Sequence, residues 1–561
     1  MFSLKKKQNL SAEEKIKKKK KKEKLLLISS GILLGLSFPP FPFPFQLLMF
    51  VALIPYLFVI EKRDGLAEIN KATYLTFFVF SLITIYWVGS WQTGTDPFLM
   101  IAGVVLLFFN PLLFLIPSTL YYFAKKYLNS KIALILIPFF WLTYEYFYTL
   151  TDISFPWLIL GTGLSKFKVF IQSADIIGAF GITILVIFIN IFIYLSIRDY
   201  KKNPKQISIY ILIVILIFSF SIFYGVYRIS TFNNSGKEIT VGIIQPNLDP
   251  WEKWREDKLE ELKNEYLSLS KKAVENYAKL LIWPETALPV YLNTPGYFKT
   301  KYEITRFLLN TKTFLLTGMP NVKYFSKDDV IPIDAKVTDN GNTKYATYNS
   351  VLGFSYQNTM VQHYGKMKLV PFGERVPFVN TFNFLGDLFS WGVGLSGWNV
   401  GQDTTLFTFS NNIENDSTSV TNTDSVKISS LVCYESVYPI FVTLFVNKGA
   451  ELITVVTNDS WYGKSSGPYQ HKEIAVLRAI ENRRSVVRAA NGGISCIIDP
   501  LGTTVAETKL FTKDVLVGNV MLENEITFYT KHPYLIPIFS VFISLSVILI
   551  VIIRKFIWRK K

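Results

Sequence analysis

Histidine and cysteine are scarce in this chain of 561 residues, which has three of the first and two of the second. The histidines, His363, His471 and His532, have no Cys or His neighbours at the spacing of metal ligands, so the sequence predicts no metal site and no cofactor. Cys496 lies within an apolar strand pattern, where a buried free thiol is the simplest interpretation. A single disulfide to Cys433 stays an open alternative.

Charged residues are also few: they make up 18% of the chain, against 50% hydrophobic residues. With a mean hydropathy of +0.29, this composition is typical of a membrane protein. The apolar runs predict about eight transmembrane helices, the first two of which are short and joined by a proline-rich turn. These runs are 25–38, 45–60, 72–89, 98–123, 132–149, 174–197, 207–226 and 534–553.

The net charge of +17 is concentrated at the N-terminus, where residues 1–24 hold eleven Lys against three Glu. Beside an apolar span, such a run indicates a cytosolic anchor rather than a nucleic-acid site. Basic loops alternate with loops that have few basic residues, and the tail 554–561 is basic again. The alternation predicts that both termini are cytosolic and that residues 227–533 lie on the opposite side of the membrane.

The segment between the last two apolar runs alternates strand and helix patterns. Strands are predicted at 239–245, 280–283, 313–318, 428–433, 452–457, 485–490, 493–499, 503–507 and 515–521, and helices at 252–279, 297–309 and 469–482. Two polar insertions, 325–346 and 410–426, interrupt the pattern. Strands with intervening helices followed by a run of strands predict a layered α/β or α-β-β-α domain. The predicted division is a basic terminus (1–24), a bundle (25–230), a catalytic domain (238–528), a last helix (534–553) and a tail (554–561).

Three segments of this domain place a reactive or charged group just after a strand: Glu285, Lys366 and Cys433. Because strand ends converge at one edge of an α/β sheet, the three groups are predicted to meet there. A cysteine thiol is mostly protonated at neutral pH and needs activation. Glu285 can take its proton, and Lys366 can lower the thiol pKa and stabilise an oxyanion. A Cys–His pair with His471 stays an alternative.

In this order, Glu, Lys and Cys form the catalytic pattern of the nitrilase superfamily. With about eight spans around an extramembrane α-β-β-α domain, the chain resembles the apolipoprotein N-acyltransferase family, the membrane-embedded branch, over nearly its whole length. The matching segments are Phe155–Trp157, Gly178–Gly181, Gln245–Trp254, Trp283–Thr286, Thr317–Gly318, Tyr348–Ser350, Lys366–Glu374, Cys433–Glu435, Thr457–Trp461 and Arg478–Asn491.

The resemblance implies roles for individual residues. Glu285 matches the general base, Lys366 the oxyanion-stabilising lysine and Cys433 the acylated nucleophile. Four supporting residues are implied as well: Glu374, Tyr434, Glu435 and Trp254. Glu374 is expected to keep Lys366 charged or to orient Glu285. For the other three, packing, ion pairing and loop anchoring stay open as alternative roles.

The reaction implied by the resemblance moves an acyl chain from the sn-1 position of a phospholipid, through a thioester on Cys433, to the α-amine of a diacylglyceryl-cysteine. The expected donor is phosphatidylethanolamine, the acceptor is an apolipoprotein, and the location is the bacterial inner membrane with the catalytic domain periplasmic. A monomer is expected, because one chain carries the triad. Apolar side chains are expected at a lipid-facing rim of the site: Phe378, Phe382, Phe384 and Leu385.

Two alternatives to acyl transfer remain at this point. A membrane-anchored amidase could use the same three residues to hydrolyse a small amide. A transport or scaffold protein with an inactive nitrilase-like domain is the other alternative, and the intact Glu285, Lys366 and Cys433 count against it.

Overall fold

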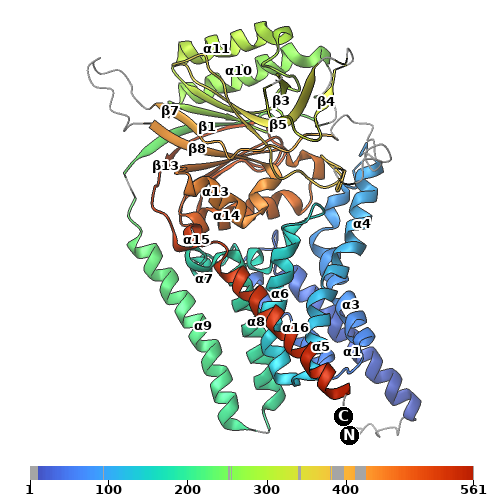
Figure 1. The fold of residues 1–561 in the computed structure, drawn as a ribbon. Coiled ribbons are helices and arrows are strands. Elements are labelled where there is room, and N and C mark those ends of the chain that lie inside the picture. The colour runs from blue at the N-terminus through green and yellow to red at the C-terminus, as the bar shows by residue number, and fades with distance from the viewer. Residues whose placement is uncertain are drawn as a thin grey trace, which may run out of the picture.

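The structure, a computed structural model, describes residues 11–559 apart from 93, 96, 202, 235, 251–252, 254–255, 327, 339–340, 342, 380, 382–396 and 411–424. A bundle of helices stands below a two-sheet sandwich (Figure 1). The first described helix begins, and the last one ends, at the tip of the bundle farthest from the sandwich (Figure 1).

The bundle consists of long helices joined by short helical turns. The long ones are α1 (Ala12–Leu36), α3 (Leu66–Thr84), α4 (Pro97–Leu113), α5 (Leu115–Tyr127), α6 (Ser130–Tyr148), α8 (Ala174–Asp199), α9 (Pro204–Thr231) and α16 (Leu535–Arg559). The short ones are η1 (Phe45–Phe50), α2 (Ile54–Ile60), η2 (Tyr86–Gly89), η3 (Pro156–Leu158), η4 (Leu160–Leu164), α7 (Lys168–Ile171) and α15 (Phe528–Lys531).

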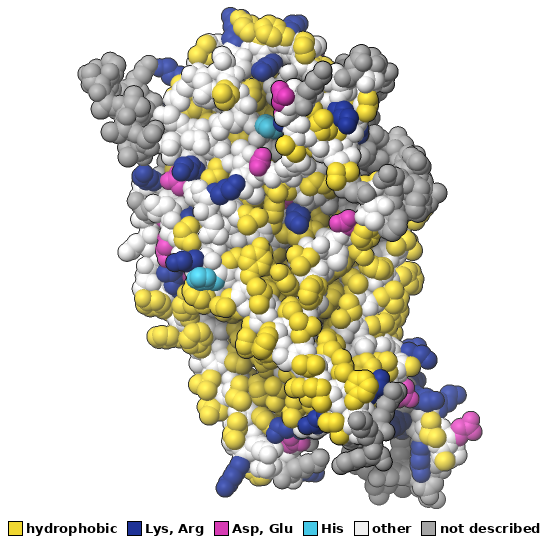
Figure 2. All heavy atoms as spheres, viewed as in Figure 1, with side chains coloured by type: hydrophobic (Ala, Val, Ile, Leu, Met, Phe, Trp, Pro, Cys, Tyr) yellow, Lys and Arg dark blue, Asp and Glu magenta, His cyan; other side chains and the backbone are white. Residues whose placement is uncertain are grey.

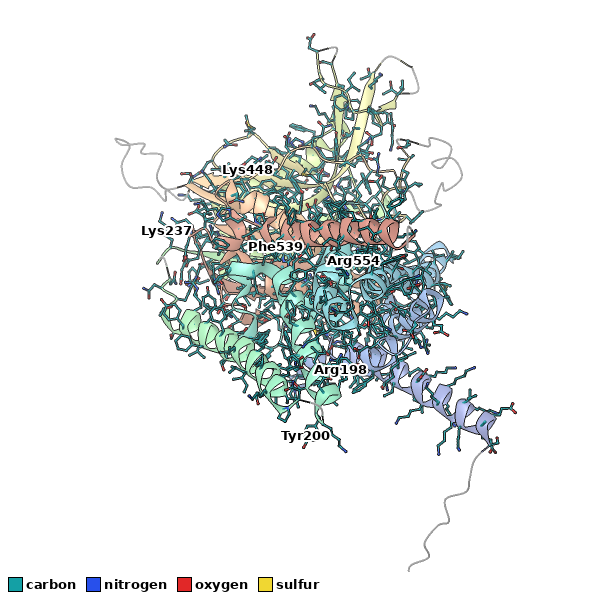
Figure 3. The ribbon with its side chains drawn as sticks, turned by 60° about the horizontal axis from the view of Figure 1, so that its bottom comes forward. Arg198, Tyr200, Lys237, Lys448, Phe539 and Arg554 are labelled. Atoms are coloured by element: carbon teal, nitrogen blue, oxygen red, sulfur yellow. The ribbon has the colours of Figure 1, made fainter. Side chains whose placement is uncertain are left out.

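Five helices within the described residues are long and apolar enough to cross a membrane: Leu66–Thr84, Leu99–Tyr127, Ala174–Asp199, Pro204–Thr231 and Leu535–Ile557. They support five of the eight predicted spans, and the full count stays a prediction. The run 25–38 forms the second half of α1, whose first half is rich in lysine, and 45–60 is divided between η1 and α2. Along α16, exposed Phe539 lies between the sandwich side, where Lys448 lies, and the basic tip with Arg554 (Figure 3).

Two facing β-sheets form the sandwich. The first has the order β13 (Asp514–Met521), β1 (Glu238–Gln245), β2 (Leu280–Trp283), β3 (Phe314–Phe325), β5 (Lys344–Phe354), β4 (Lys336–Val337), and β6 (Gln362–Gly365) pairs with β5. The second has the order β12 (Thr504–Glu507), β11 (Cys496–Ile498), β10 (Val486–Ala490), β9 (Leu452–Thr457), β8 (Ser425–Val432), β7 (Phe407–Ser410). In each sheet the three central parallel strands are mostly buried, as strands covered on both faces are.

Helices cover the outer face of each sheet. Apolar residues of α10 (Leu259–Glu275) and α11 (Phe298–Thr311) pack on the first sheet, while α13 (Pro439–Asn447) and α14 (Gly467–Asn482) lie against the second sheet (Figure 1). The predicted α-β-β-α arrangement is therefore confirmed. The α13 and α14 layer also faces the bundle, which places the second sheet nearer the membrane than the first.

The strand and helix ranges predicted from the sequence omit five elements of this sandwich: α13, β4, β5, β6 and β7. Helix α13 is too short and uniformly apolar for its period to distinguish helix from strand. Strand β5 begins inside the polar insertion 325–346, where polar residues hide the alternation. Most of the other insertion, 411–424, lies outside the described residues.

A buried ion-pair cluster joins the sandwich to the bundle. The Asp175 carboxylate, at the start of α8, accepts hydrogen bonds from Arg483 Nη2 (2.6 Å) and Nε (3.0 Å) and from Arg228 Nε (3.0 Å). Arg483 is fully buried at the end of α14. One carboxylate therefore holds cations from α9 and from the catalytic sandwich at the same point.

Asp175→Asn should lower the free energy of unfolding by about 3 kcal/mol, because it leaves the buried Arg483 guanidinium without its counter-charge. Thermal unfolding of the full-length protein in detergent measures this effect. Asp64→Asn is the matched control: Asp64 pairs with Lys125 but its side chain is 94% exposed, so its loss should cost less than about 0.5 kcal/mol. Equal decreases in the unfolding temperature of the two variants would show that this cluster does not hold the sandwich to the bundle.

Candidate active site

Cys433 lies at a sharp turn directly after β8, where the short helix η7 (Cys433–Val437) begins. Its φ of +51° is rare for a residue other than glycine, and such a conformation persists only where surrounding contacts impose it. One of those contacts comes from Glu435, whose Oε2 accepts a hydrogen bond from the backbone N–H of Val432 (2.8 Å). The turn leaves the thiol half-buried at the end of the strand.

Glu285, Lys366 and Glu374 form a charged network beside this turn. Lys366 Nζ lies 2.7 Å from Glu374 Oε1 and 3.4 Å from Glu285 Oε1, and its side chain is 1% exposed. Asn349 on β5 donates to the same oxygens of Glu285 (2.8 Å) and Glu374 (2.9 Å). Glu374 Oε2 accepts from the backbone N–H of Val370 (2.8 Å). Two carboxylates thus share one buried ammonium and one amide.

The turn after β2 brings Glu285 into this network, and it needs a glycine on the neighbouring strand. Gly318 of β3 lies so close that an added Cβ would stand 2.5 Å from the Cα of Glu285 and 2.7 Å from the carbonyl oxygen of Pro284. The backbone N–H of Ala287 donates to the carbonyl of Gly318 (2.7 Å). Only a residue without a side chain permits this approach.

Burial and neighbouring charges set the protonation states of Lys366 and Cys433. Burial opposes the charge of Lys366, but Glu374 and Glu285 more than offset it, so its pKa is raised and the ammonium stays charged. Burial also raises the pKa of the Cys433 thiol, and the nearby Glu285 charge raises it further. Lys366 acts in the opposite direction without reversing the shift. Lys366 thus lowers the thiol pKa as expected, but burial and the Glu285 charge outweigh it, so a base must remove the proton.

Alkylation by iodoacetamide tests this protonation state. Because the pKa of Cys433 is raised, the thiol form persists to higher pH, so labelling at pH 8 should be slower than for free cysteine and should still rise above about pH 9. Removing the Glu285 charge should lower the thiol pKa, so Glu285→Gln should label faster at pH 8. The assay is read by intact mass in a Cys496→Ala background. Slower labelling of Glu285→Gln would contradict the assignment.

The three predicted triad residues are brought together, but not at one edge of one sheet. Glu285 follows β2 and Lys366 follows β6, both in the first sheet, whereas Cys433 follows β8 in the second. The expectation of a single sheet edge is corrected: the site lies where the two sheets face each other.

The supporting residues have different surroundings. Glu435 is fully buried, and its Oε1 accepts from Tyr364 Oη (2.7 Å) and from the backbone N–H groups of Met367 (2.6 Å) and Lys368 (3.2 Å). It thereby ties the turn at Cys433 to the segment that carries Lys366. Tyr434 instead points to the bundle.

The Tyr434 hydroxyl donates to the carbonyl of Ser154 (2.7 Å), and its ring stacks near Phe155 with centroids 6.1 Å apart. The predicted roles of Trp254 and of the rim residues Phe382, Phe384 and Leu385 fall outside the described residues. Phe378 is described and is 43% exposed.

A second buried cluster lies behind the nucleophile. His471 Nε2 donates to the carbonyl oxygen of Cys433 (3.1 Å), so its contact with the nucleophile is through the backbone. Its Nδ1 lies 3.0 Å from Asp459 Oδ1, and Asp459 Oδ2 pairs with Arg488. Donor atoms of Cys433, Asp459 and His471 lie within 4.8 Å of one another, a spacing that a metal ion could bridge. Arg488 already supplies the positive charge at this carboxylate.

Two residues of the site carry no role in the sequence prediction. Asn349 bridges Glu285 and Glu374, and Lys253 donates to the carbonyl oxygens of Glu285 (3.3 Å) and Thr286 (3.0 Å). Burial lowers the pKa of Lys253 to about 8. Asn349 lies in the motif segment Tyr348–Ser350 and Lys253 in the segment Gln245–Trp254, and membership of these segments is the only sequence feature that points to them.

The chain is similar to proteins of known families along most of its length. Residues 30–192 match the model of the apolipoprotein N-acyltransferase N-terminal domain, and residues 240–527 match that of carbon-nitrogen hydrolase. An apolipoprotein N-acyltransferase of Chlorobaculum tepidum is 33% identical, covering 94% of this chain and 96% of its own. One of Geobacter metallireducens is 30% identical over 90% of each chain, and one of Rickettsia typhi is 30% identical over 86% and 88%.

Both parts of the chain thus match in one order, a bundle domain followed by a carbon-nitrogen hydrolase domain, and relatives at 30–33% identity are covered nearly end to end. The chain belongs to the apolipoprotein N-acyltransferase family.

Proposed function

We propose that this membrane enzyme transfers a fatty acyl chain from a phospholipid to the N-terminal amine of a diacylated apolipoprotein. One observation supports the chemistry above all: Lys366 and two carboxylates converge, buried, next to a thiol held at a strained turn. These groups provide a base, a nucleophile and a fixed positive charge, which are the components that acyl transfer through a covalent intermediate requires.

In the first half-reaction, the Glu285 carboxylate takes the proton of the Cys433 thiol, and the thiolate attacks the carbonyl carbon of an sn-1 ester. Lys366 stabilises the oxyanion of the tetrahedral intermediate. The C–O bond of the ester then breaks, and Glu285 returns its proton to the leaving oxygen. The products are a lysophospholipid and a thioester on Cys433.

In the second half-reaction, the free amine of the acceptor attacks the thioester carbonyl. Glu285 takes a proton from the attacking nitrogen, and Lys366 again stabilises the oxyanion. Breaking the C–S bond yields the amide, and the departing sulfur recovers the proton from Glu285. Glu374 and Asn349 keep Glu285 and Lys366 in position during both half-reactions.

The junction between the two parts of the chain supports a lipid substrate. Gln470 on α14 donates to the carbonyls of Pro39 (3.0 Å) and Thr84 (2.9 Å), and its Oε1 accepts from the Trp157 indole (2.8 Å). Loops of the bundle therefore form the layer directly beneath the nucleophile. An amidase acting on a small soluble amide has no need for this arrangement, and the relatives above are N-acyltransferases by name.

Several finer assignments belong to the same proposal. The donor is phosphatidylethanolamine and the working unit is a monomer. The protein spans a bacterial inner membrane about eight times, with cytosolic termini and the 238–528 domain in the periplasm. The basic tip of the bundle opposite the sandwich supports this orientation, since positive residues collect on the cytosolic side.

Intact mass spectrometry of the purified protein with phospholipid tests the function. We expect an acyl adduct that persists in water and disappears when a diacylated lipopeptide with a free N-terminus is added. An adduct that turns over rapidly without lipopeptide would favour the hydrolase, and the absence of any adduct would favour a non-enzymatic protein.

A further inference from the structure

A cavity of about 120 Å³ lies at the seam between the bundle and the sandwich, apart from the candidate active site. It opens where the ends of α6 and α8 and the segment before α16 meet α13. Most of its lining is apolar or aromatic, including Leu150, Phe180, Phe441, Leu444 and Tyr534. Cys433 is not among the described residues that line it.

One charged side chain lines this cavity among the described residues, that of Lys368. Its Nζ lies 5.2 Å from the ring centroid of Tyr438, and among the described residues the nearby carboxylates Glu435 and Asp152 act on it through space, without an ion-pair contact. Burial lowers the pKa of Lys368, whereas Glu435 and Asp152 oppose this shift. An anion in the cavity would supply the direct counter-charge that the protein does not.

The cavity lies at the end of the bundle that meets the sandwich, which is the level expected for lipid headgroups when the bundle spans a membrane. It is lined from the sandwich-side ends of three bundle elements, and tyrosines there, such as Tyr146 and Tyr534, are typical of a membrane interface. Leu150 (58% exposed) and Leu444 (37%) leave its mouth open. Hydrophobic side chains cover much of this face from the lower part of the bundle up to the seam (Figure 2).

We propose that this cavity binds a membrane phospholipid, with the phosphate on the Lys368 ammonium and the first part of an acyl chain along Leu150 and Leu444. Since Cys433 does not line it, the lipid held here is a resident ligand and not the acyl donor. A diacylated lipopeptide, which has no phosphate, is not the expected occupant.

Such a lipid would act on the nucleophile through two hydrogen bonds. The backbone N–H of Lys368 donates to Glu435 Oε1, and Glu435 Oε2 accepts from the N–H of Val432, the residue before Cys433. A phosphate that fixes Lys368 therefore also fixes the segment that carries Lys366. The membrane itself would help to order the active site.

Binding is best measured on full-length Cys433→Ala protein, which cannot form a thioester, so that the result does not depend on the proposed acyl transfer. Delipidated protein in detergent is titrated with dioleoyl phosphatidylglycerol and examined by native mass spectrometry. We expect saturable phospholipid binding, of which Lys368→Met should weaken one site about tenfold by removing the charged partner of the phosphate. Lys368→Arg should bind nearly as well as the parent.

Controls separate a phosphate site from general lipid adhesion. Lys531→Ala removes an exposed lysine of α15 outside the cavity lining and should leave binding unchanged. Dioleoylglycerol should bind about tenfold more weakly than the phospholipid, and inorganic phosphate should not compete. Leu444→Trp, which fills the apolar mouth of the cavity, should also weaken phospholipid binding. It replaces Lys368→Met as the test variant if Lys368→Met does not fold.

Unchanged phospholipid binding in both Lys368→Met and Leu444→Trp would overturn the proposal. Equal affinity for dioleoylglycerol, or stronger binding of a diacylated lipopeptide, would do the same. If the wild-type protein showed no acyl transfer, the outcome of this binding test would still stand.

Discussion

Cys433→Ala abolishes the acyl adduct and the transfer reaction, whereas Cys496→Ala retains both; this is the largest effect that we expect. The two cysteine thiols have very different surroundings. Cys433 is half-buried at a turn beside Lys366 and Glu285, while Cys496 is fully buried within β11. Without the Cys433 sulfur no thioester can form, and the residual rate should fall to background.

The comparison is made by intact mass after incubation with phospholipid, followed by lipopeptide. Each variant has one remaining cysteine, so any adduct is assigned without peptide mapping. Both cysteines are free in the structure, and removing Cys496 therefore breaks no disulfide. An adduct on Cys433→Ala protein would place the nucleophile elsewhere and refute the mechanism.

Glu285→Gln should slow adduct formation about 10³-fold, the second largest effect. The amide keeps the size of the side chain but cannot accept the thiol proton, and the thiol has a raised pKa that makes a base necessary. Lys366 keeps its 2.7 Å contact with Glu374, so the cation stays in place. Single-turnover mass spectrometry with phospholipid measures the rate.

Two observations make this prediction specific. Glu260→Gln, which removes an exposed carboxylate paired with Lys263 on α10, should react at the wild-type rate. Glu285→Gln should also alkylate faster at pH 8 while forming the adduct more slowly. A mere loss of folding would not produce these opposite changes, and a parallel decrease in both rates would contradict the role of Glu285 as base.

Much of this site could be predicted from residues whose position the local pattern determines. Strands 280–283 and 452–457 have the predicted bounds, because short apolar runs between turn residues leave few alternatives. Glu285, Lys366 and Cys433 each follow a strand, which local sequence can reveal. That they come from two sheets depends on long-range pairing, which no local pattern contains.

The remaining differences have the same origin. The raised pKa of Cys433 results from burial by residues distant in sequence, which no local pattern contains. Asn349 was visible only as part of a motif, since an amide can bridge two carboxylates only after β5 has placed it between them. Tyr434 was predicted beside the nucleophile, but its hydroxyl contacts the bundle.

The contacts of Gln470 with Pro39, Thr84 and Trp157 also bear on how the protein is made. These three bundle positions precede Gln470 by more than 300 residues in the chain, so the ribosome delivers them first. We therefore expect the bundle, which carries the docking surface of α14, to enter the membrane before α14 is made. We expect the Cys433 nucleophile, which lies above this surface, to become competent only after the bundle has inserted.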